Sequence, residues 1–126
     1  MATTAGRRAA RTQAVVPLGQ GWVLPYWMER LDEHYEILQP TVPWLTKPPS
    51  EYMKSGQMFY AFEMEEKMLP YVADFVGAER LVFATDYNHS DSKFPHTVEE
   101  VMERKDLSDG LKAKIMGENA AQLYSL

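Results

Sequence analysis

The chain has 126 residues, 45% of them hydrophobic, and a formal net charge of −5, which suits a single domain with an apolar core. It has no cysteine, which excludes disulfides, thiolate metal sites and a cysteine nucleophile, and which fits a cytoplasmic protein. The acidic balance disfavours nucleic acid, and no apolar run approaches the roughly 20 residues that span a bilayer, so we expect neither nucleic-acid nor membrane partners.

The first 13 residues are basic and contain no acid: Arg7, Arg8 and Arg11 are their charged residues. We expect a disordered tail over residues 1–13, with a targeting role as the alternative. Ala14 to Leu18 then predicts the end of a strand, which Pro17 cuts short. Residues 14–126 form the expected domain.

A long amphipathic helix is predicted over residues 24–38, with Pro25 in its first turn. We expect the acids of this helix, such as Asp32, to face solvent. Prolines predict an irregular connection after it, and Ser50 is expected to cap a short helix over residues 51–55. Apolar residues recur along the long helix at helical spacing: Leu24, Trp27, Met28, Leu31, Tyr35 and Leu38.

Two apolar strands separated by a helix are predicted next. Met58 to Phe62 is aromatic and apolar, as strands often are. The residues up to Gly77 predict a helix that begins near Glu66, with Pro70 in its first turn. Leu81 to Ala84 lacks polar alternation, which indicates a strand covered on both faces. The order strand, helix, strand predicts a parallel βαβ unit.

The last part of the chain is predicted to be helical. Thr97 followed by Glu100 has the spacing of a capping box, which predicts a helix that turns Val98, Val101 and Met102 inward. Ser108 predicts the start of a second helix, and Gly117 is expected to interrupt it. These helices should cover the last strand.

Polar groups gather where the last predicted strand ends, which is where parallel α/β folds place reactive groups. Asp86 is the first candidate catalytic residue and metal ligand, with a capping aspartate as the alternative. His89 is the second catalytic candidate. Glu63, at the end of the preceding strand, and Asp91 are candidate rim residues, although Glu63 could equally cap the next helix. Asp86, His89, Asp91 and His96 also form a candidate metal cluster, for which hydrogen-bonded turns are the alternative.

The segment from Leu81 through Phe94, with residues 114–124, resembles the C-terminal end of the amidohydrolase-related family, which includes aminocarboxymuconate-semialdehyde decarboxylase. Gly21-Trp22, Pro25-Tyr26-Trp27 and residues 29–34 resemble one branch of it. The resemblance implies an α/β fold, the C-terminal portion of a TIM (β/α)8 barrel with two to three parallel strands and flanking helices. It also implies a divalent metal, usually zinc, with Asp86 as a ligand or proton-transfer group.

The sequence departs from the family pattern in two respects. Members carry a His-x-His pair on the first strand and another histidine on a middle strand, whereas this chain has only His34, His89 and His96. Relatives that end the last strand with aspartate, aromatic, proline, histidine have proline where this chain has Asn88, which implies a less rigid loop here.

We therefore interpret the chain as a C-terminal fragment of a metal-dependent hydrolase or decarboxylase, one that acts on a small-molecule substrate only in the complete enzyme. Two alternatives remain open. One is a non-catalytic interaction module that self-associates or binds a complementing chain through an open sheet edge. The other is a small autonomous metal-binding α/β protein that uses the loop from Asp86 to His96.

Overall fold

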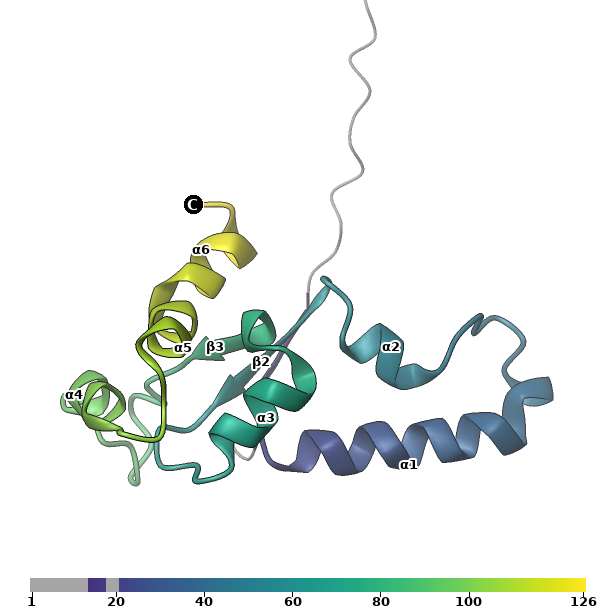
Figure 1. Ribbon diagram of the computed structural model, residues 1–126, viewed down its shortest axis with the longest axis horizontal. Coiled ribbons are helices and arrows are strands. Elements are labelled where there is room, and N and C mark those ends of the chain that lie inside the picture. The colour runs from purple at the N-terminus through teal and green to yellow at the C-terminus, as the bar shows by residue number, and fades with distance from the viewer. Residues whose placement is uncertain (1–13, 18–20) are drawn as a thin grey trace, which may run out of the picture.

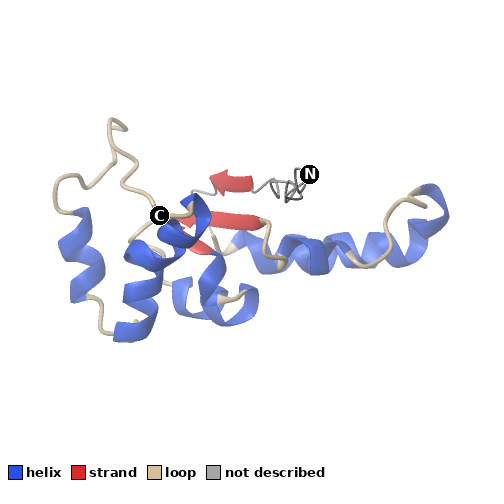
Figure 2. Cartoon of the chain, turned by 90° about the horizontal axis from the view of Figure 1, so that it is seen from above, coloured by secondary structure: helices blue, strands red, loops and turns tan. Residues whose placement is uncertain are grey.

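A computed structural model of the chain describes residues 14–17 and 21–126, so the basic segment 1–13 lies outside the described residues. A three-stranded parallel sheet lies at the centre, in the order β1-β2-β3 (Figures 1 and 2). Strand β1 is Ala14–Pro17, β2 is Met58–Phe62 and β3 is Leu81–Phe83. The predicted set of two to three parallel strands is confirmed.

Helices follow each strand (Figure 1). After β1 come α1 (Val23–Leu38), the 3-10 turn η1 (Gln39–Thr41) and α2 (Pro49–Met53). After β2 come α3 (Leu69–Val76) and the 3-10 turn η2 (Ala78–Arg80). After β3 come α4 (Thr97–Glu103), α5 (Asp109–Ala113), the π-helical turn η3 (Lys114–Glu118) and α6 (Asn119–Tyr124). In the described part of the chain, none of these helices has the length and apolarity that a bilayer span requires.

Strands β2 and β3 are covered on both faces, as the absence of alternation predicts. On one face Phe59 and Val82 pack with Leu123 of α6. On the other face Tyr60 lies beside Leu81 in the sheet register, and both join the larger core cluster. That cluster draws its other members from the helices around the sheet, among them Leu24, Met28, Leu69, Val72, Val76 and Ile115.

Helix α3 begins at Leu69, later than predicted, and Pro70 lies in its first turn. Proline is tolerated there because the N–H groups of the first turn have no acceptor within the helix, so the N–H that proline lacks costs no helical hydrogen bond. Gly77 ends it with φ of 105°, a backbone conformation that favours glycine. A Cβ at this position would lie 2.8 Å from Oε1 of Glu79, the end of a flexible side chain that can move away, so it is the positive φ that makes any other residue strained here.

Helix α2 begins at Pro49, earlier than predicted, and Pro48 rather than Ser50 occupies its N-cap. Ser50 donates from its N–H and its Oγ to the two carboxylate oxygens of Asp32, over 2.8 and 2.6 Å. The prediction that the acids of α1 face solvent is therefore wrong for Asp32, which is half-buried, whereas Glu29, Glu33 and Glu36 are exposed. The Asp32 carboxylate accepts from the first turn of α2, where backbone donors have no helical partner.

Helix α1 buries less of its apolar stripe than the periodicity predicts. Leu24 and Met28 are buried, whereas Trp27, Leu31 and Leu38 are exposed. The C-terminal half of α1 extends past the sheet and packs against α2 (Figure 1). Too little of the described chain reaches this half of the helix to cover the whole stripe.

The predicted capping box at the start of α4 is wrong. His96 occupies the N-cap without a side-chain hydrogen bond, and Thr97 is buried as the first helical residue. Glu100 accepts from the ammonium group of Lys93 instead of a backbone N–H. Of the three residues predicted to point inward, Val101 is buried, while Val98 and Met102 are exposed.

The last three helical elements, α5, η3 and α6, follow one another without a loop between them. Ser108 caps α5 as predicted, since its Oγ accepts from the N–H of Leu111 over 3.2 Å. The α-helix is interrupted around Gly117, as predicted, but by the π-helical turn η3 and not by a loop, so the chain stays helical into α6. Asn119 then fixes α6 to the sheet, donating from Nδ2 to the carbonyls of Ala78 and Leu81 over 2.7 and 2.6 Å.

Candidate functional site

The candidate site lies on the loop that leaves β3. Strand β3 ends at Phe83, and Asp86 follows three residues later, at the carboxyl end of the sheet. Asp86 has φ of 50° and its carbonyl accepts the N–H of His89 over 3.2 Å, so the backbone turns sharply at this point. The turn brings side chains that are three and five positions apart onto one side of the loop.

Three of the four predicted metal-cluster residues come together. Nδ1 of His89 lies 3.1 Å from Oδ2 of Asp86. One ligand atom each from Asp86, His89 and Asp91 lies within 4.8 Å of the others, and all three residues are exposed. His96, the fourth, is the N-cap residue of α4 and does not belong to this group.

The donor set fits a divalent ion that takes both nitrogen and oxygen. In a tetrahedral zinc site with bonds near 2.0–2.1 Å, neighbouring ligand atoms lie about 3.3 Å apart. The 3.1 Å between Nδ1 of His89 and Oδ2 of Asp86 is close to that spacing. The carboxylate oxygen of Asp91 lies within 4.8 Å of the ligand atoms of the other two residues, so a small side-chain movement would bring it to the same ion. One imidazole and two carboxylates from this chain leave at least one ligand position to another group.

Asn88, which stands where relatives have proline, gives the loop after β3 a backbone conformation that proline cannot adopt. Asn88 has φ of 81°, which asparagine tolerates better than most residues, whereas proline is confined near −65°. Proline is therefore incompatible with this backbone, so the loop conformation seen here differs from any that proline at this position would allow. The positions of Asp86 and His89 depend on that conformation.

Glu63 lies at the end of β2 and faces the same site. It lines a small cavity of about 50 Å³ together with Glu65, Asp86 and Asp91. Burial raises the pKa of Glu63 above its usual value, and the nearby carboxylates, Glu65 first among them, raise this pKa further. Glu63 does not cap α3, whose N-cap is Met68. Its backbone N–H donates to Oε1 of Glu66 over 2.9 Å.

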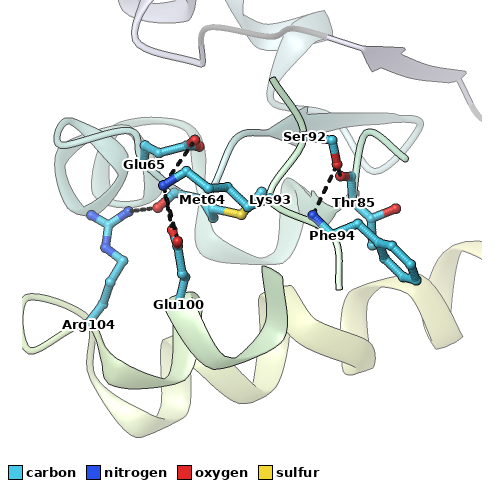
Figure 3. Close-up of polar contacts among 8 residues, drawn as sticks. All are labelled: Met64, Glu65, Thr85, Ser92, Lys93, Phe94, Glu100 and Arg104. Carbon is cyan, nitrogen blue, oxygen red and sulfur yellow. Dashed lines mark hydrogen bonds and ion pairs between the residues drawn. The ribbon is translucent and has the colours of Figure 1, made fainter. Parts of the chain in front are cut away.

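Two contributors to this region were missed from the sequence, Glu65 and Ser92. Glu65 lines the cavity from the segment after β2. The acidic residues that follow this strand in the sequence could have indicated a contribution to the site. Ser92 also lines the cavity, and its Oγ donates to the carbonyl of Thr85 over 2.8 Å and accepts the N–H of Phe94 over 3.3 Å (Figure 3). No motif marks such a loop closure.

The three parallel strands, each followed by helices, have the arrangement of a portion of a TIM (β/α)8 barrel, with ligand-type side chains at the carboxyl end of the last strand. The amidohydrolase family model matches residues 18–126, and the chain belongs to this family. None of the curated proteins matches it.

Among solved structures, the chain is similar to the crystal structure of amidohydrolase map2389c from Mycobacterium avium subsp. paratuberculosis K-10. The TM-score is 0.73 at 22% sequence identity, and the match covers 88% of this chain and 27% of that chain. At this identity the likeness shows the fold alone. The chain thus spans about a quarter of the length of the relative that it resembles.

Proposed function

We propose that this chain contributes Asp86 and His89 to the metal site of an amidohydrolase-type enzyme, a hydrolase or a decarboxylase that acts on a small molecule. The observation that carries the proposal is the 3.1 Å approach of His89 to Asp86 at the end of the last strand, with Asp91 in the same group. Zinc is the proposed ion, since the donors are one imidazole and two carboxylates.

The chain's own residues have distinct roles in this proposal. Without an ion, Nδ1 of His89 can donate its hydrogen to Asp86, whereas with an ion bound a deprotonated Nδ1 and Oδ2 of Asp86 would both face the ion, so that metal binding would release a proton. Asp91 supplies a second carboxylate. Glu63, whose pKa is raised, is suited to hold a proton at the rim of the cavity. A bound divalent ion would lower the pKa of a water molecule and polarise a substrate oxygen.

The remaining ligands come from outside this chain in the proposal. The family's His-x-His pair has no counterpart among His34, His89 and His96. We therefore propose that the chain acts as the C-terminal part of a complete barrel and does not turn over substrate alone.

Calorimetric titration of the purified chain with zinc tests the proposal. We expect binding weaker than about 1 μM, because three exposed ligands form an incomplete site, and Asp86→Asn should weaken it at least about tenfold. The matched control is Asp74→Asn, the same change at an exposed aspartate of α3. Equal zinc binding by the wild type and Asp86→Asn would contradict the proposal.

The alternative of an autonomous metal-binding protein is favoured by the presence of three ligand-type residues on one loop. It predicts one-to-one zinc binding with a dissociation constant near or below about 10 nM, since a self-contained structural site binds tightly. The same titration therefore separates the two functions.

The alternative of an interaction module is favoured by exposed aromatic residues on and beside α1. Trp22, Tyr26 and Trp44 are 51%, 58% and 71% exposed in the described structure. Self-association or binding of a complementing chain through this region would appear as a rise of mass with concentration in analytical ultracentrifugation. The leading proposal expects such a partner to be the rest of the barrel.

A further inference from the structure

We propose that Lys93 is a positioning residue of the candidate site: it ties the loop after β3 to helix α4 and to the segment after β2, and so sets the distance between the carboxylates of the two segments. The inference rests on the proposed function, because the distance matters only if Asp86, Asp91 and Glu63 share a site. It is carried by contacts that the metal-site residues themselves do not make.

The loop after β3 closes on itself without outside help. Ser92 bonds to the carbonyl of Thr85 and to the N–H of Phe94 (Figure 3), and the rings of Tyr87 and Phe94 meet edge to face with centroids 4.8 Å apart. These contacts set the internal shape of the loop. They do not fix where the loop lies relative to the rest of the molecule.

Lys93 supplies that connection. Its Nζ lies 3.1 and 3.3 Å from the carboxylate oxygens of Glu100 on α4, and 3.9 Å from Oε1 of Glu65 (Figure 3). Within the described residues 86–96, no other side chain forms a hydrogen bond or ion pair with a group beyond residues 85–96. The ammonium group therefore holds three segments together.

Helix α4 holds the second segment by a separate contact. Arg104 lies one turn after Glu100, so the two side chains share a face of the helix region. Its guanidinium donates to the carbonyl of Met64 over 2.8 Å (Figure 3). Asp106 accepts from Nε of the same group over 3.0 Å. Glu100 thus holds the loop after β3, while Arg104 holds the segment after β2.

The acidic cavity lies between these two held segments. Glu63 and Glu65 line it from one side, and Asp86 and Asp91 line it from the other. Like charges at this spacing repel one another, so the segments tend to separate unless something draws them together. Lys93 does not line the cavity, but its charge attracts Glu65 across the gap. It acts through the loop and not on a ligand.

Hydrogen exchange of the full chain tests this inference. We expect Lys93→Gln to speed amide exchange in residues 86–92 about two- to fivefold, the range set by exposed ion pairs, and to weaken zinc binding by a similar factor. Lys93→Arg keeps the charge and should restore both values. Glu100→Gln should act like Lys93→Gln, and the double variant should add little to either single change.

Lys67→Gln is the matched control. Lys67 is an exposed lysine on the segment after β2, and it lines a surface pocket together with Glu100 of α4. It forms no ion pair with any residue in the described structure. Its loss changes the net charge equally and should leave exchange in residues 86–92 unchanged. If Lys93→Gln matches Lys67→Gln in exchange, the positioning role is overturned. If the wild type binds no zinc through Asp86, the proposed function fails, while the exchange experiment still decides whether Lys93 fixes the loop.

Discussion

Leu81 and Val82 are buried in the sheet, whereas every residue from Asp86 to Asp91, only a few positions further along the chain, is exposed. The sheet is held by apolar contacts on both faces, and the loop is held by turns, hydrogen bonds and one lysine. The residues that stabilise the fold are therefore different from those to which we assign the proposed metal site. Changes in the sheet should alter folding, and changes in the loop should alter metal binding with little effect on folding.

The largest expected effect is on the free energy of unfolding, when the same Phe→Ala substitution is made in the sheet and in the loop after β3. Phe62→Ala should cost about 3–5 kcal/mol of unfolding free energy, because Phe62 is 2% exposed and lies in the larger core cluster. Phe94→Ala in the exposed loop should cost less than about 1 kcal/mol. Urea unfolding of both variants measures the difference, and similar losses would show that the loop is part of the core.

The next effect concerns the side-chain bonds that dock α6 on the sheet. Asn119→Ala should cost about 1–3 kcal/mol, because it leaves the carbonyls of Ala78 and Leu81 without the donor that Asn119 supplies. Gln122→Ala, at an exposed position of the same helix, should change stability by no more than about 0.5 kcal/mol. Equal effects in thermal unfolding would contradict the assigned role of Asn119.

A smaller effect is expected from the strained backbone of the loop. Asn88→Ala should cost about 1 kcal/mol, since φ of 81° is unfavourable for alanine, whereas Asn88→Gly should be close to neutral. Urea unfolding compares the two variants directly. Equal free energies of unfolding for the alanine and glycine variants would show that residue 88 does not need a positive φ in the folded loop.

The smallest effect is a gain. The raised pKa of Glu63 means that the folded state disfavours its charge, so its contribution to stability falls as pH rises from the usual glutamate value through the raised one. Glu63→Gln should therefore stabilise the chain at pH 7 by less than about 1 kcal/mol. The gain should vanish at pH 3, below the usual pKa of about 4.3, where glutamate is neutral in both states. Unfolding curves at the two pH values that show no such difference would contradict the assignment.

Much of the fold followed from local sequence. The apolar run from Leu81 predicted a strand covered on both faces, and Met58–Phe62 was predicted with the bounds that the structure shows. The proximity of Asp86, His89 and Asp91 also followed from sequence, because a short loop at a strand end leaves these side chains little room to separate.

The features that were missed depend on contacts between distant segments. Glu100 was predicted to cap α4, but Lys93 offers it a full positive charge, which is a stronger partner than a backbone N–H. Asp32 was predicted to face solvent, but the first turn of α2 lies against it. The stripe on α1 was predicted to be buried, yet periodicity indicates only which face is apolar and not what covers it.

The most direct test of a metal site at the end of β3 is a zinc titration of the 15N-labelled chain, followed by amide chemical shifts. We expect the shifts to change first and most in residues 86–92, with smaller changes at Glu63 and Glu65, and we expect Asp86→Asn to remove these changes. Changes centred elsewhere in the chain, or changes that persist in Asp86→Asn, would show that the end of β3 is not the metal site.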